Sequence, residues 1–398
     1  MFGISTLLVL SLAAGADLQT LSGKKIAGDI AGLDKQTLVL KTATGDQRIP
    51  VADVLQIDLG AQEPLPTTPY YDVELTDGSV FHCPTLAIKG ANLVVTAQPD
   101  MALTIPLTAV YSVLRDAHDA KVRQDWQKFS AKRARFDVVG VRGADGQLNP
   151  LEGTFGVGTE SGDGIEFTYQ ESGKKLTPKL SKVQGLLFVP RPAENAPQTL
   201  CKVTDAARNL VVSADILVNA EGVTLTSVAG VRVKYASSAK VARLDFSKGK
   251  LTYLSDLDPS KSGNAELSTE DGPSLGQFLA YRKNLNLNNG PLRLDGITYA
   301  KGVALHAGTQ LVYEIGGDYK EFRVIVGVDE SVQTESPVEV VIEGDGRVLA
   351  REAVNRRGKA KTVAVDVKGV QQLRVSVVSK ELLELGGQAN LCDAKVSK

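Results

Sequence analysis

The chain has 398 residues, of which 43% are hydrophobic and 23% are charged, a composition typical of globular domains with apolar cores. Its 45 basic residues nearly balance 46 acidic ones, which gives a formal net charge of -1. This balance argues against a nucleic-acid binder, which needs a basic excess or stripe, and the length suggests roughly two to four domains.

Residues 1–16 begin with an apolar run, FGISTLLVLSLAA, and end in the small-x-small pattern Ala14-Gly15-Ala16. The run is shorter than the ~20 residues that cross a bilayer as a helix. Its pattern predicts a cleaved signal peptide, with a buried first strand as the alternative. We therefore expect an exported protein, periplasmic or extracellular, with no membrane span after cleavage.

Four β-rich segments of alternating apolar and polar residues follow the expected signal peptide. They cover residues 17–62, 70–115, 136–192 and 199–247. The first two share an echo, IPVADV at 49–54 and IPLTAV at 105–110. Alternation broken by Asp-Gly pairs predicts hairpins, so each segment is expected to form a small SH3-like or Sm-like barrel or twisted sheet. Such units are too small to bury much surface alone, and neighbours should share a core.

One helix is predicted between the second and third segments, over residues 116–135, which contain no Gly or Pro. Val122, Trp126 and Phe129 fall on one stripe of this helix. We expect Trp126 to anchor the helix to a neighbouring barrel. The lysines and arginines of the helix are interpreted as its solvated face, with an anionic partner as the alternative.

The sequence contains no recognisable catalytic motif. Cys83, Cys201 and Cys392 lie far apart, and we interpret them as buried apolar groups, although an exported protein could oxidise one pair. His82 and Cys83 are neighbours and would point to opposite faces of a strand, which disfavours a zinc site. No catalytic residue is assigned.

The C-terminal part contains motifs of a known family. Tyr299-Ala300-Lys301-Gly302, Leu305-His306-Ala307 and Val326-Gly327-Val328-Asp329 follow one another in this order. Together with the strands up to about Val396 they resemble the NPCBM family of carbohydrate-binding modules, also found beside family-98 glycoside hydrolases. The layout is similar to multi-repeat exported proteins of Planctomycetes-type bacteria. With its polar connector, the expected module spans residues 250–398.

The resemblance implies a galactose-binding-like jelly-roll β-sandwich whose loops hold the ligand at one end of the strands. Asn390-Leu391 stands where the family usually has an Asp-Trp pair, and Glu330 replaces a second Asp. The candidate carbohydrate-binding residues are Tyr299, His306, Asp329, Glu330 and Asn390.

Each candidate also has a structural alternative. His306 offers a donor and an acceptor to a sugar hydroxyl, or is half-buried against a backbone carbonyl. Asp329 and Glu330 would accept from hydroxyls or hold a structural calcium, or cap a turn. Tyr299 is a stacking platform or a core residue, and Tyr281 and Tyr313 are further possible platforms.

The sequence thus predicts an all-β, exported, non-catalytic protein that binds a glycan through its C-terminal module, with galactose-type sugars as candidates. No cofactor is expected beyond a structural calcium. The upstream segments would be a spacer or a scaffold for envelope proteins. The alternative is a structural or protein-binding envelope component that has lost sugar binding, and a hydrolase within the repeats is a third, less favoured hypothesis.

Overall fold

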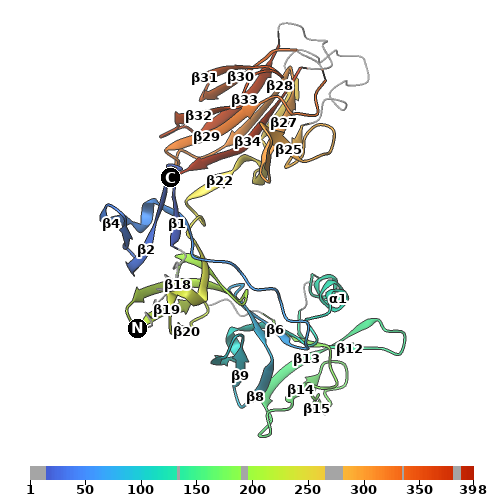
Figure 1. The fold of residues 1–398 in the computed structure, drawn as a ribbon. Coiled ribbons are helices and arrows are strands. Elements are labelled where there is room, and N and C mark those ends of the chain that lie inside the picture. Colours follow the sequence, from blue (N-terminus) through green and yellow to red (C-terminus); the bar gives the residue numbers. More distant parts are fainter. Residues whose placement is uncertain (1–14, 132–134, 190–195, 265–280, 334–335, 380–386) are drawn as a thin grey trace, which may run out of the picture. The chain divides into compact units, whose positions relative to one another are not determined.

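The computed structural model describes residues 15–131, 135–189, 196–264, 281–333, 336–379 and 387–398. The chain divides into two compact units, Met1–Lys248 and Gly249–Lys398. Strands dominate both units (Figure 1), which confirms the all-β prediction. Within these ranges no helix has the length and apolarity to cross a membrane. The expected signal peptide lies almost wholly outside the described residues.

The strands of the first unit fall into four groups, one for each β-rich segment. The first group comprises β1 (Ala16–Thr20), β2 (Lys25–Leu33), β3 (Thr37–Thr42), β4 (Gly45–Pro50) and β5 (Val54–Asp58). The second comprises β6 (Tyr71–Leu75), β7 (Val80–Cys83), β8 (Thr85–Lys89), β9 (Asn92–Ala97), β10 (Met101–Pro106) and β11 (Val110–Leu114). The third comprises β12 (Asp137–Arg142), β13 (Leu148–Gly158), β14 (Ile165–Tyr169), β15 (Lys175–Leu176) and β16 (Gly185–Leu187). The fourth comprises β17 (Cys201–Asp205), β18 (Leu210–Asn219), β19 (Gly222–Ser227), β20 (Arg232–Tyr235) and β21 (Val241–Asp245).

Each group closes on itself, because its first strand pairs with its last: β1 with β5, β6 with β11, β12 with β16 and β17 with β21. A single 3-10 turn precedes the last strand in three groups, at Val51–Asp53, Leu107–Ala109 and Ser238–Lys240. The first two turns account for the similar sequences IPVADV at 49–54 and IPLTAV at 105–110, which form equivalent turns. Pro50 and Pro106 both have φ of -58°, the value that the proline ring imposes, and they start the turn at the same place.

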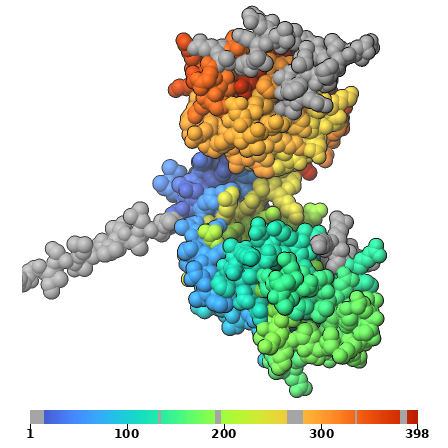
Figure 2. All heavy atoms as spheres, turned by 90° about the vertical axis from the view of Figure 1, so that its right-hand side faces the viewer, coloured from blue at the N-terminus to red at the C-terminus, as the bar shows by residue number. Residues whose placement is uncertain are grey.

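The four groups share one core. Strand β5 pairs with β21, and β11 pairs with β16, so the first group joins the fourth and the second joins the third. One cluster of buried apolar side chains contains residues of all four groups. Figure 2 shows the blue, cyan and green atoms of the first unit in contact at its surface. Asn209 is buried at a junction, where its side chain accepts from His82 N at 2.8 Å and donates to Gln98 O at 2.6 Å. The expectation of shared burial is confirmed.

Helix α1 (Ala120–Ser130) is shorter than predicted. It begins at Ala120 because Asp119 caps it, accepting from the backbone N–H groups of Lys121 and Val122. Trp126 is 5% exposed and packs in a small core with Val138 and Leu187. The anchoring role of Trp126 is confirmed.

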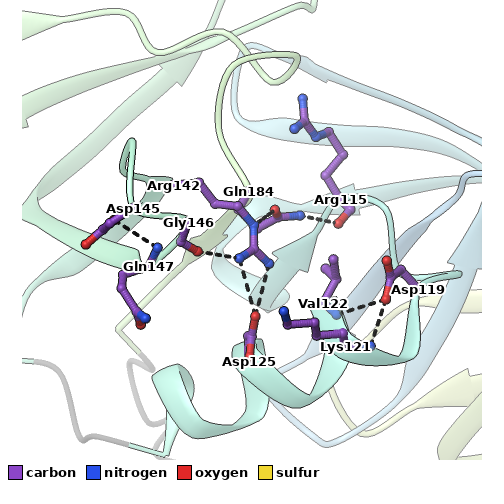
Figure 3. Close-up of polar contacts among 10 residues, drawn as sticks. All are labelled: Arg115, Asp119, Lys121, Val122, Asp125, Arg142, Asp145, Gly146, Gln147 and Gln184. Atoms are coloured by element: carbon purple, nitrogen blue, oxygen red, sulfur yellow. Dashed lines mark hydrogen bonds and ion pairs between the residues drawn. The ribbon is translucent and has the colours of Figure 1, made fainter.

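A polar network also holds the helix to the third group (Figure 3). The Arg142 guanidinium lies 3.3 Å from Asp125 Oδ2 on the helix and donates to Gln184 Oε1 at 2.8 Å. Gln184 in turn donates to Arg115 O at 2.7 Å. The helix is therefore held by the packing of the Trp126 indole and by a network of hydrogen bonds.

The second unit is a β-sandwich of two sheets (Figure 1). Its strands are β22 (Leu251–Tyr253), β23 (Lys261–Asn264), β24 (Arg282–Lys283), β25 (Leu292–Leu294), β26 (Ile297–Tyr299), β27 (Gly302–His306), β28 (Thr309–Glu314), β29 (Glu321–Gly327), β30 (Val338–Gly344), β31 (Arg347–Val354), β32 (Lys361–Asp366), β33 (Gln372–Val378) and β34 (Gln388–Ser397), with a 3-10 turn at Leu254–Asp256. One sheet has the order β24-β27-β34-β29-β32, with β22 also on β34, and the other has the order β23-β28-β33-β30-β31. Strands β22 to β24 belong to the connector, which is thus part of the sandwich.

The apolar core of the sandwich lies between the two sheets and includes alternate residues of β29, namely Phe322, Val324 and Val326. A second, smaller cluster lies on the outer face of the β34 sheet, where Leu292 and Leu294 cover Ala304 and Cys392. The hairpin β25–β26 therefore packs on that outer face. All three cysteines are free and buried, as the sequence predicted.

Candidate functional site

Most of the predicted binding residues gather at one end of the β34 sheet. Strands β27 and β29 lie on either side of β34 and both run antiparallel to it. Their carboxyl ends therefore meet at the same edge, near the start of β34. His306 ends β27 opposite Gln388, and Gly327 ends β29 opposite Asn390. Asp329 and Glu330 follow directly after β29.

Asp329 is at the centre of a buried polar cluster and is 1% exposed. Its carboxylate accepts from Asn286 Nδ2 at 3.0 Å, Arg293 N at 3.1 Å and Asn390 Nδ2 at 2.5 Å. It also accepts from the hydroxyl of Ser331 at 2.6 Å. These bonds connect the covering segment 286–293 to the central strand of the sheet, because Asn390 lies in β34.

The ionised form of Asp329 is favoured despite its burial. Burial by itself would raise the pKa of this carboxyl group, but the hydrogen bonds from Ser331, Arg293 and Asn390 together outweigh burial and hold the pKa below its ordinary value. Because five N–H and O–H donors already surround its two oxygens, Asp329 does not fit as a calcium ligand. Across the described part of the chain, no group of three or more His, Cys, Asp or Glu is placed to hold a metal ion.

A polar cleft of about 220 Å³ opens beside this buried cluster. Three elements form it: the β25–β26 turn, the end of β29 and the loop between β31 and β32. Its lining residues are Leu294, Asp295, Gly327, Val328, Glu330, Arg356, Gly358 and Ala360. Gly327 lets the hairpin close on the sheet, since a Cβ there would come within 2.9 Å of Leu294.

Three charged side chains of the cleft are each held by one backbone contact. Ala360 N donates to Asp295 Oδ2 at 2.9 Å, Gly296 N donates to Glu330 Oε1, and Arg356 Nε donates to Val332 O. The other carboxylate oxygen of Asp295 and of Glu330 makes no hydrogen bond or ion pair with the described residues. The same holds for the two terminal nitrogens of Arg356. The cleft thus presents two carboxylate acceptors, Asp295 and Glu330, and a guanidinium with several N–H donors, Arg356. This set suits a ligand rich in hydroxyl groups.

The five predicted residues occupy different places relative to the cleft. Glu330 lines it and is exposed. Asp329 and Asn390 are buried behind it, each 1% exposed. Tyr299 is half-buried against the outer-face cluster, and burial raises its pKa. His306 is half-buried, lies across β34 from the cleft and does not line it.

Two further tyrosines considered as stacking platforms belong to the inner core. Tyr313 is fully buried, and Tyr281 packs against the same cluster. Leu391, at the position where the resemblance leads one to expect Trp, is also fully buried in that core. The replacement therefore concerns packing between the sheets and leaves the cleft intact.

Sequence reasoning did not select Asp295 and Arg356 as site residues. The signal for Asp295 was the Asp295-Gly296 pair, which forms the hairpin turn with φ of 51° and 77°. Arg356 stands in an Arg-Arg-Gly run between two strands and has no motif of its own. Only the fold brings these two residues to Glu330.

The NPCBM/NEW2 domain family matches residues 250–397. That range begins one residue after the start of the second unit and contains the buried cluster and the cleft. Residues 250–397 form an NPCBM/NEW2 domain. The resemblance stated from the motifs at Tyr299, His306 and Asp329 is confirmed, and the chain carries a domain of a carbohydrate-binding family.

A protein of Renibacterium salmoninarum, named as an endo-alpha-N-acetylgalactosaminidase, is 27% identical to the chain over 141 residues. The match covers 32% of this chain and 8% of that relative's length. The chain thus corresponds to a small part of this relative.

Among solved structures, the CBM51-2 and INT domains of Clostridium perfringens ZmpB are 25% identical, covering 37% of this chain and 32% of that chain with a TM-score of 0.31. The CBM51 of Clostridium perfringens GH95 in complex with methyl-galactose is 22% identical, covering 37% of this chain and 99% of that chain with a TM-score of 0.31. At such TM-scores the likeness does not by itself establish a fold for the whole chain.

Proposed function

We propose that this protein is an exported, non-catalytic glycan-binding protein whose NPCBM/NEW2 domain takes a sugar in the cleft of Asp295, Glu330 and Arg356. The first unit, with its four groups of strands, is a spacer or a scaffold for envelope proteins. The observation that carries the proposal is the cleft itself, an open polar site in a domain of a carbohydrate-binding family.

The chemistry of the cleft supports a neutral sugar. Carboxylates of Asp295 and Glu330 accept hydrogen bonds from hydroxyl groups, while the Arg356 guanidinium donates to hydroxyl or ring oxygens. At about 220 Å³ the cleft is smaller than the roughly 300–1,000 Å³ of drug-sized ligand sites. It therefore suits one sugar residue of a chain, and galactose-type sugars are the first candidates to test.

The test uses the full chain on a glycan array, followed by calorimetric titration of the best neutral glycan. We expect Glu330→Ala and Arg356→Ala each to weaken binding by about 1–3 kcal/mol, since each change removes the hydrogen-bond partner of a sugar hydroxyl. Arg347→Ala is the matched control, because Arg347 is exposed in the same domain and does not line the cleft.

Two results would contradict the proposal. Unchanged affinity in both cleft variants would exclude this cleft as the sugar site. Binding to none of the glycans would instead favour the structural or protein-binding alternative for the whole chain.

A further inference from the structure

Arg282 and His306 lie next to each other on the outer face of the β34 sheet. In the pairing of β24 with β27, Arg282 is opposite Ala304, and His306 is two residues further along β27. Because side chains alternate along a strand, Arg282, Ala304 and His306 share one face. Diagonal neighbours of this kind are about 7–8 Å apart, within reach of long side chains.

The cleft lies on this same outer face of the β34 sheet, because the turn of the β25–β26 hairpin lines it. Ala304 belongs to the outer-face cluster beneath the hairpin β25–β26, and His306 lies beyond that cluster, level with Gln388. The cleft is on the β29 side of β34 and His306 is on the β27 side, so about two interstrand spacings, roughly 10 Å, separate the two strands. A short oligosaccharide is long enough to reach both places.

Among the described residues, no carboxylate neutralises the charge of Arg282, which is half-buried and forms no ion pair with them. Its neighbour Lys283, by contrast, is 2.6 Å from Asp258 Oδ1. Burial and the positive charge of Arg282 lower the pKa of His306, which favours the neutral imidazole with its one N–H donor.

A guanidinium that forms no ion pair with the described residues, next to an imidazole N–H on the same face of the sheet, is a donor-rich site with net positive charge. Such a site favours an anionic oxygen group over a hydroxyl, because charge-assisted hydrogen bonds are about twice as strong as neutral ones. The acidic residues of the cleft, Asp295 and Glu330, have the opposite preference. The two places therefore differ in the chemistry that they recognise.

We propose that Arg282 and His306 form an anionic subsite, which takes the carboxylate or sulfate of an acidic sugar adjoining the neutral sugar in the cleft. The inference rests on the proposed function of the cleft and adds a substrate class to it, namely acidic glycans. Arg282 supplies the charge, and His306 donates one hydrogen bond that orients the anionic group.

The test compares glycans that share a core and differ only in charge. The full chain is titrated at pH 7 and low salt with matched neutral, uronic-acid and sulfated oligosaccharides. We expect at least one acidic form to bind about tenfold more tightly than its neutral partner. Arg282→Gln should abolish this preference and leave affinity for the neutral form unchanged. Whichever of the uronic-acid and sulfated forms gains more affinity over the neutral form identifies the anionic group as carboxylate or sulfate.

Further variants separate this inference from the proposed function. His306→Gln should reduce the preference partially, and Arg347→Gln should leave it intact. Glu330→Ala should weaken binding of the neutral form, because the cleft loses an acceptor. Neutral glycans that bind as well as acidic ones, or a preference that survives in Arg282→Gln, would overturn the subsite and leave the cleft proposal standing. Binding to no glycan of either kind would overturn both.

Discussion

Asp329 shows how one side chain can be important to a site without touching its ligand. Its position after a Gly-Val pair suggested a binding carboxylate. The fold instead buries it and surrounds it with donors from three segments of the chain. Its role is to hold the covering segment and β34 together, and thereby to place Glu330 and the hairpin at the cleft.

We expect Asp329→Asn to lower the free energy of unfolding by about 2–3 kcal/mol at pH 7, because hydrogen bonds to a charged acceptor are replaced by weaker ones. The folded-state pKa is depressed, so the contribution is fully present above the unfolded value of about 3.9 and is lost as pH falls through the folded value. The difference between variant and wild type should therefore shrink below about pH 4.

Urea unfolding at pH 7, 5 and 3 measures both effects. Asp318→Asn is the control, since Asp318 is exposed in the same domain. A deficit that stays constant from pH 7 to pH 3 would show that the ionised carboxylate is not what stabilises the cluster.

At the scale of elements, helix α1 depends on a glycine in the neighbouring strand. A Cβ at Gly140 would lie 2.9 Å from Cζ3 of Trp126. The absence of a side chain in β12 thus allows the indole ring to reach the sheet. The sequence predicted the anchor from the stripe of apolar residues, but not the strand that receives it.

We expect Gly140→Ala to lower the unfolding free energy by about 1–3 kcal/mol through overpacking against the indole. When Trp126→Leu is also present, Gly140→Ala should lower the unfolding free energy far less, because the clashing indole ring is gone. Thermal melts of the single and double variants test this coupling.

Gly60→Ala is the matched control for the backbone effect of the substitution, because nothing lies within 4 Å of a Cβ at that position. Equal losses for Gly140→Ala with and without Trp126 would contradict the packing argument.

At the scale of the whole molecule, the two units have separate cores. The main core of the first unit ends at Phe246, and that of the second begins at Leu254. We therefore expect residues 249–398 to fold when expressed alone, with one cooperative thermal transition that matches a transition of the full chain. Circular dichroism melts measure both.

A fragment of residues 249–378 is the control for that experiment. It lacks β34, which pairs with β22, β27 and β29 in the middle of its sheet, and it should not fold. A non-cooperative melt of residues 249–398 would show that the domain needs the rest of the chain. The expected boundaries of the four upstream repeats stay predictions.

Local patterns in the sequence were enough to establish the all-β class, the helix with its Trp126 anchor and the identity of the C-terminal domain. Alternating apolar and polar residues, proline-initiated turns and short motifs depend only on residues close together in the sequence. They can therefore be recognised from the sequence alone. The pairing of β5 with β21 and the burial of Asp329 depend on which distant segments pack together. The cleft is of this second kind, because Asp295, Glu330 and Arg356 come from three separate segments and meet only when the hairpin closes on the sheet.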